Sequence, residues 1–228
     1  RRLPPASATR SASTGSPAAT RCGSPTTAVT CSGTTYPTTR STASRAGATG
    51  DDGVVAGAEG LEGAGLTPAS VLFPIVLRPH APSVLLTQRN ETLRDHPGQI
   101  SFPGGRVEPQ DRSPQDTALR EAQEEIGLGA RHVEVVGYLP DYRTVTGFCV
   151  TPVVALVTPP FDLRPDPREV AEVFEVPFSF LMDAANHQRR TLLYRGSPRQ
   201  YIAMPYGDYF IWGATAAIIA TLARALAR

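Results

Sequence analysis

The fold is decided by the stretch Arg120-Glu121-Ala122-Gln123-Glu124-Glu125-Ile126-Gly127-Leu128, which a double glycine, Gly104-Gly105, precedes in the sequence. Residues three and four apart share one side of a helix, so Glu121, Glu124 and Glu125 are expected to project from one arc. Like charges at these spacings destabilise an isolated helix by about 0.2–0.5 kcal/mol per pair. The pattern therefore predicts a positive partner. Mg²⁺ fits because it takes oxygen ligands, and a solvated acidic face is the alternative.

The limits of this helix can be predicted from its flanking residues. Ser113 is a suitable N-cap, Pro114 suits the first helical position, and Asp116 stands near a capping-box position. Gly127 is placed to end the helix at about residue 126. The core-facing stripe is expected to consist of Ala118, Leu119, Ala122 and Ile126.

Glu125 lies at the border of that apolar stripe, where an unpaired carboxylate is costly. Arg120 is the nearest basic residue on the helix, and we expect it to orient one of the acids. A solvent-exposed arginine is the alternative.

These residues resemble the signature of the Nudix hydrolases, in which the helical part reads R-E-U-x-E-E-x-G-U. The family box begins G-x5-E-x7, whereas here the position after Gly105-x5 is Asp111, with one additional residue before Arg120. The resemblance implies a mixed sheet sandwiched between helices, an α/β (α+β) fold. It also implies Mg²⁺ or Mn²⁺ held by Glu121, Glu124 and Glu125, with catalytic roles for Glu121, Glu124 and Arg120.

The segment upstream is similar to the pattern L-L-T-x-R-S-x3-R-x3-G-x3-F-P-G-G of the coenzyme A pyrophosphatase branch of that family. Every fixed position matches except Asn90, where the pattern has Ser. The two motifs together cover residues 85–128. The resemblance implies substrate-binding roles for Arg89, Arg94, Gly98, Phe102, Gly104 and Gly105.

The chemistry of coenzyme A agrees with this upstream segment. CoA carries a pyrophosphate and a further phosphate, and Arg89 and Arg94 can offer planar forks for bidentate contacts with them. Ordinary surface charge is the alternative for either arginine. The implied reaction yields 3′,5′-ADP and (acyl-)4′-phosphopantetheine. Alternatives are hydrolysis of another nucleoside diphosphate derivative, such as ADP-ribose or NADH, or a Nudix-fold binding module without catalysis.

Composition divides the chain into two parts. Residues 1–50 contain no Asp, Glu, Lys, Ile, Phe or Met, so they cannot bury enough apolar surface to offset the entropy of ordering. We expect residues 1–66 to be a disordered segment and linker, and residues 67–228 to form the Nudix domain. The formal charge of +1 does not indicate the basic surface that nucleic-acid binding requires. The expected partner is a small molecule.

Apolar runs and turn residues predict the remaining elements. Strands are expected at residues 69–77, 83–88, 133–139, 149–157 and 170–176, and a hairpin at 190–194 with 200–204. A short helix is expected at 177–183 and an Ala-rich helix at 214–227, which is too short to span a membrane. The sequence also lacks a signal-peptide pattern, and we expect a cytoplasmic protein. Interleaved strands and helices predict a mixed sheet between helices.

Overall fold

The computed structural model describes residues 29–31, 34–36, 65–93, 96–194 and 196–228. Its main sheet has the strand order β10-β4-β3-β9-β7, with three short strands paired at its sides. The strands of this sheet are β3 (Thr67–Val76), β4 (Ser83–Arg89), β5 (Ile100–Ser101), β6 (Gly104–Arg106), β7 (Val133–Tyr138), β8 (Tyr142–Arg143), β9 (Phe148–Val157) and β10 (Val170–Pro177).

The sheet is mixed because β3 and β9 run parallel while the other pairs run antiparallel. Successive residues of a strand face opposite sides, so each strand serves two cores. On β3, Leu72 belongs to the apolar core on one face and Phe73 to the core on the other. The nearly continuous apolar runs of β3 and β9 follow from this burial on both faces.

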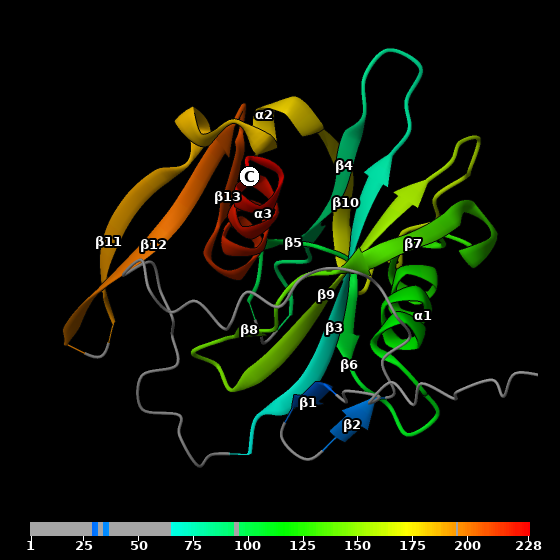
Figure 1. The fold of residues 1–228 in the computed structure, drawn as a ribbon, viewed down its shortest axis with the longest axis horizontal. Coiled ribbons are helices and arrows are strands. Elements are labelled where there is room, and N and C mark those ends of the chain that lie inside the picture. Colours follow the sequence, from blue (N-terminus) through cyan, green and yellow to red (C-terminus); the bar gives the residue numbers. More distant parts are fainter. Residues whose placement is uncertain (1–28, 32–33, 37–64, 94–95, 195) are drawn as a thin grey trace, which may run out of the picture.

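Helices cover both faces of the sheet (Figure 1). Helix α1 (Pro114–Ile126) packs on one face through Ala118, Ala122 and Ile126. On the other face lie α3 (Gly213–Leu226) and the short α2 (Phe178–Met182), and α3 buries Ile218 and Ile219 in the core. The predicted α/β fold with a sheet between helices is thus confirmed.

A second sheet flanks α3, with the order β11-β12-β13. Its strands are β11 (Gln188–Tyr194), β12 (Ser197–Tyr206) and β13 (Tyr209–Trp212). Strands β11 and β12 form the expected hairpin, with longer strands than the sequence indicates. The short strands β5, β6, β8 and β13 were not predicted. They have two to four residues, which is too short for a periodic pattern to show.

Two three-residue strands, β1 (Val29–Cys31) and β2 (Thr34–Tyr36), pair antiparallel. The rest of residues 1–64 lies outside the described residues, so the disorder expected there stays a prediction. Cys149 of β9 is buried and disulfide-bonded. Among the residues with described positions, no helix combines the length and apolarity needed to cross a membrane.

Candidate active site

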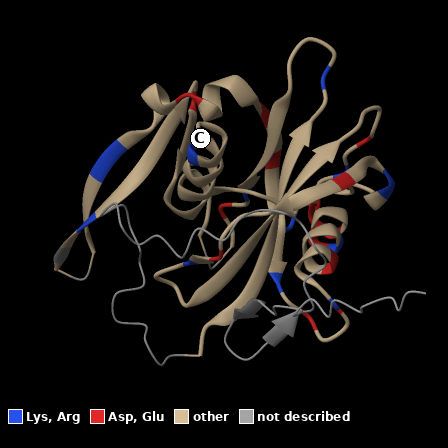
Figure 2. Cartoon of the chain, in the orientation of Figure 1, with Lys and Arg blue, Asp and Glu red and all other residues tan. Residues whose placement is uncertain are grey.

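The carboxylate-bearing helix begins and ends where its flanking residues predict. The hydroxyl of Ser113 accepts a hydrogen bond from the backbone N–H of Asp116 at 3.1 Å, and Pro114 opens the helix. Gly127 ends it in the left-handed region with φ 70°. A side chain there would lie 3.1 Å from the backbone of Arg164, so both conformation and space favour glycine. These caps fix where the three glutamates project, and Figure 2 shows acidic residues along α1.

The double glycine brings the backbone of β6 against these glutamates. A Cβ on Gly105 would lie 2.3 Å from Oε1 of Glu121, and a Cβ on Gly104 would lie 2.5 Å from the carbonyl oxygen of Ser70. The backbone N–H of Gly104 donates to Oε2 of Glu125 at 3.1 Å. Only glycine permits this approach, and the loop therefore packs directly on the carboxylates.

Arg120 is held in one orientation by carboxylates on both sides. Its Nε and Nη2 donate to the two oxygens of Asp111 at 3.1 and 3.0 Å, and Nη1 donates to Glu121 and Glu124 at 3.0 and 2.9 Å. Nη2 also donates to the carbonyl of Arg106 at 3.0 Å. Bidentate guanidinium–carboxylate pairs fix geometry as well as charge. Arg120 is thus a positioning residue for two of the glutamates, and the alternative of a solvent-exposed arginine is wrong.

Asp111 contributes to the site by holding Arg120. Burial alone would raise the pKa of this carboxyl, but hydrogen bonds from Arg120, the backbone N–H of Glu108 and the hydroxyl of Thr117 outweigh it and lower the pKa. Asp111 stands where the family box has Glu, one position further from the arginine in sequence. The structure shows that the shorter acid with the longer loop still reaches Arg120.

The three glutamates differ in exposure. The side chain of Glu124 is 58% exposed, that of Glu121 15%, and Glu125 is 5% exposed. Burial raises the pKa of Glu121, and the charge of Arg120 opposes this. Burial raises the pKa of Glu125 to about 8, because the hydrogen bond from Gly104 offsets only part of the desolvation and the charge of Glu121 adds to it. The negative charges of Glu121 and Glu125 are thus poorly compensated, and a nearby cation would stabilise them.

Glu169 is a further acid of this region that sequence analysis missed. Its negative charge contributes to the raised pKa of both Glu121 and Glu125. Its backbone carbonyl accepts from Asn90 N–H at 2.8 Å, and the N–H of Asp166 donates to the carbonyl of Glu125 at 2.8 Å. The loop before β10 is thereby fixed beside the end of α1. The sequence shows Glu169 only as an acid directly before an expected strand, which does not by itself indicate a site residue.

Arg89, a predicted substrate-binding residue, also lies beside a carboxylate of α1. Its Nη1 is 3.9 Å from Oε1 of Glu125, and its buried Nε has no hydrogen-bond partner in the part of the chain that is described. Arg94 lies outside the described residues. Gly98 adopts φ 68° in the loop before β5. Phe102 is buried against the ring of Phe73, with centroids 4.6 Å apart, where it supports the glycine loop.

The residues around α1 fit a divalent metal by donor type. They offer hard carboxylate oxygens, two of them in environments where the negative charge is poorly compensated. Within the described residues, no group of three or more Asp, Glu, His or Cys side chains is arranged closely enough to hold a metal ion. Mg²⁺ usually takes only one or two carboxylates from the protein and completes its coordination with water or substrate phosphate.

Fold and site together define a mixed α/β protein with helical carboxylates beside a glycine loop. The chain belongs to the Nudix family, since the NUDIX domain model matches residues 66–195. It is 44% identical over 155 residues to the Nudix hydrolase NudL of Escherichia coli (strain K12), covering 68% of this chain and 80% of that protein. It is 42% identical over 156 residues to the NudL of Photorhabdus laumondii, covering 68% and 83%.

The chain is also similar to solved structures. A Nudix hydrolase from M. smegmatis, RenU, is 26% identical with a TM-score of 0.43, covering 50% of this chain and 71% of that one. A C. elegans Ap4A hydrolase is 18% identical with a TM-score of 0.43, covering 49% and 80%. Family membership makes the chain a Nudix hydrolase, implies pyrophosphohydrolase activity, and is generally accompanied by use of a divalent metal.

Proposed function

We propose that this Nudix hydrolase splits coenzyme A or an acyl-CoA at the pyrophosphate, yielding 3′,5′-ADP and 4′-phosphopantetheine or its acyl form. The observation that carries the proposal is the position of Arg89. This residue belongs to the CoA-type motif, and its guanidinium lies beside Glu125 with Nε unpartnered among the described residues. A buried donor without a partner costs roughly 1–3 kcal/mol, and a phosphate oxygen of the substrate would satisfy it.

The proposed roles follow the geometry of α1. Glu121, Glu124 and Glu125 would hold Mg²⁺ or Mn²⁺, which would supply charge stabilisation and a more acidic water. Arg120 fixes Glu121 and Glu124. Glu124 is the most exposed of the three, and it is our candidate for the base that accepts a proton from the attacking water. Gly104 and Gly105 let the backbone approach the carboxylates.

Other nucleoside diphosphate derivatives are the second candidate, because the same carboxylates would serve any pyrophosphate. ADP-ribose and NADH belong to this class. A binding module without catalysis is a third candidate, and the intact carboxylate helix with its positioning arginine argues against it.

The decisive experiment is a product-resolved assay of the purified protein with CoA, acetyl-CoA, ADP-ribose and NADH, with and without Mg²⁺. We expect metal-dependent release of 3′,5′-ADP, with the highest kcat/KM for CoA or acetyl-CoA. A higher kcat/KM for ADP-ribose or NADH would replace the proposal with the second candidate. Absence of turnover on all four would favour the binding module.

The arginine contacts are tested separately, with Arg89→Lys and Arg94→Lys. Lysine keeps the charge but loses the planar fork, and a lost charge-assisted bond lowers kcat/KM about ten- to a hundred-fold. A larger loss on CoA than on dephospho-CoA would place the arginine on the 3′-phosphate, and equal losses would place it on the pyrophosphate. Arg189→Lys, an exposed change on β11, is the control. Unchanged kinetics in both variants would contradict the role of the arginines.

A further inference from the structure

A pocket of about 570 Å³ lies at the C-terminal end of α1, away from the carboxylates. Its walls come from the last turn of α1, the turn at Ala130–His132 and the segment after the Pro159-Pro160 bond. At 3.6 residues per turn, Gln123 lies about 200° around the helix from Glu121. The pocket therefore opens on the opposite side of α1 from Glu121 and Glu125. The proposed hydrolysis uses none of its side chains.

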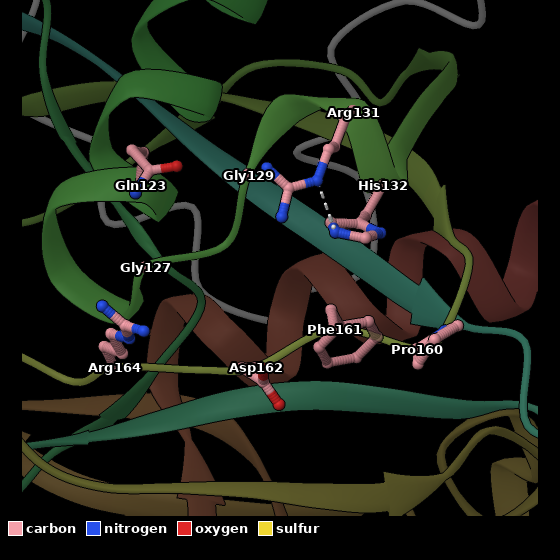
Figure 3. Close-up of a pocket in the computed structure, with 9 residues that line it drawn as sticks. All are labelled: Gln123, Gly127, Gly129, Arg131, His132, Pro160, Phe161, Asp162 and Arg164. Atoms are coloured by element: carbon pink, nitrogen blue, oxygen red, sulfur yellow. Dashed lines mark hydrogen bonds between the residues drawn. The ribbon is translucent and has the colours of Figure 1, made fainter.

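Two arginines enter this pocket from different segments (Figure 3). Nε of Arg131 donates to Nε2 of His132 at 3.0 Å, so Nε2 acts as the acceptor and the guanidinium is directed by the imidazole. Nη1 of Arg131 lies 3.7 Å from where a Cβ on Gly129 would stand, and Oε1 of Gln123 lies at the same distance from that point. The guanidinium and the amide thus share the space above Gly129.

Arg164 is anchored through its backbone. Its N–H donates to the carbonyl of Ile126 at 2.8 Å, and the carbonyls of Gln123 and Glu125 accept from the N–H groups of Gly127 and Asp166. These carbonyls at the end of α1 are already satisfied by backbone donors. The guanidinium of Arg164 is therefore not required for capping, and among the described residues it makes no ion pair or hydrogen bond.

The rest of the lining suits a small polar anion. The ring of Phe161 packs edge-on against His132 and beneath Arg78, with the Arg78 guanidinium carbon 5.2 Å from the ring centroid. Asp162 is the one acid in the lining. With Arg131 and Arg164 positive and His132 accepting, the lining carries a net charge of about +1. Guanidinium groups with unused donors prefer the oxygens of phosphate or carboxylate.

We propose that this pocket is a second ligand site, which binds the phosphate group of a small phosphorylated molecule between Arg131 and Arg164. The phosphate oxygens accept from the two guanidinium groups, and the amide of Gln123 supplies a further donor. Phosphate is favoured over carboxylate because its oxygens can face donors that enter from separate walls. Free phosphate and the phosphate of a nucleotide share this chemistry.

The test is calorimetric titration of the metal-free full-length protein, in EDTA, with inorganic phosphate, adenosine 5′-monophosphate and adenosine. We expect both phosphates to bind and adenosine not to bind. Tighter binding of the monophosphate would identify a nucleotide as the ligand, and equal affinities would identify the free anion. Absence of binding by both phosphates would overturn the proposal.

Variants decide whether any observed binding occurs in this pocket. Arg131→Gln and Arg164→Gln should each raise Kd about ten-fold or more, whereas Arg189→Gln on β11 removes an equal charge elsewhere and should leave Kd unchanged. Asp162→Asn should lower Kd by removing the opposing charge. Equal effects of all three arginine substitutions would show unspecific electrostatic attraction and overturn the proposal.

A neutral substitution separates the pocket from general charge effects. Gly129 has φ −69°, which any residue adopts, and the atoms nearest a Cβ there are 3.7 Å away or more. Gly129→Leu should therefore fold with an unchanged melting temperature, fill the pocket and abolish binding of inorganic phosphate. Retained binding in a folded Gly129→Leu variant would overturn the proposal, because the ligand would then lie elsewhere.

Discussion

Arg120 shows how one residue organises the acids around it. It contacts Asp111, Glu121 and Glu124 at once, and hydrogen bonding to Asp111 is the main reason that its own pKa is raised. The guanidinium therefore stays charged, and it keeps two carboxylates close together despite their repulsion. Removal of the arginine would leave the mostly buried Glu121 carboxylate without its counter-charge, which is destabilising.

At this scale, Glu121→Gln should lower kcat/KM on the order of a hundred-fold or more, because a bound metal would lose an anionic ligand and several kcal/mol of charge stabilisation. The amide keeps the size and helix propensity, so the far-ultraviolet circular dichroism should not change. Glu134→Gln, an exposed change on β7, is the matched control. Wild-type rates in Glu121→Gln would show that the acidic face is merely solvated.

Glu125 predicts a pH dependence of stability in the metal-free protein. Its pKa is raised from the ordinary 4.5 to about 8 in the fold, so between these values the folded state binds more protons than the unfolded state. Stability should therefore fall as the pH rises from about 5 to about 8. Urea unfolding in EDTA across this range should show a decline that Glu125→Gln flattens. A rising curve would contradict the burial of this carboxyl.

At the scale of elements, the contact between β6 and α1 depends on two glycines with different neighbours. A side chain on Gly104 would meet the backbone of Ser70 and Val71 in the adjacent strand β3, whereas one on Gly105 would meet the end of the flexible Glu121 side chain. A side chain at Gly104 would therefore disturb the sheet, whereas one at Gly105 would disturb the Glu121 carboxylate.

We expect Gly104→Ala to destabilise the fold by about 1–3 kcal/mol, because the strand backbone cannot move aside cheaply. Gly105→Ala should leave the melting temperature nearly unchanged and displace Glu121, lowering kcat/KM about ten-fold or more. Thermal unfolding and steady-state kinetics on both variants check this separation. Equal loss of stability in the two variants would contradict it.

At the scale of the whole molecule, the core extends beyond the family-matched residues 66–195. Helix α3 and strands β12 and β13 fill one face of the main sheet with fully buried side chains, including Met204, Ile211 and Ile219. The C-terminal sheet and α3 are therefore integral to the domain and not an appendage.

Ile219→Ala should accordingly cost about 2–5 kcal/mol of unfolding free energy, since it leaves a cavity where the side chain is fully buried. Leu226→Ala, on the same helix but 60% exposed, should change stability by less than about 0.5 kcal/mol. Chemical denaturation of the two variants tests the comparison. Equal costs would mean that α3 does not pack as described.

The sequence by itself determined the helix with its caps, the longer strands and the shared side of the three glutamates, because all of these depend on local periodicity and on residues a few positions apart. Only the tertiary structure decided which groups meet these glutamates. Three of these interactions join separate segments of the chain. Asp111 binds Arg120, the charge of Glu169 raises the pKa of Glu125, and Arg89 lies beside the same Glu125 carboxyl. The physical reason is that burial and charge compensation depend on distances in space, which the spacing along a chain does not fix.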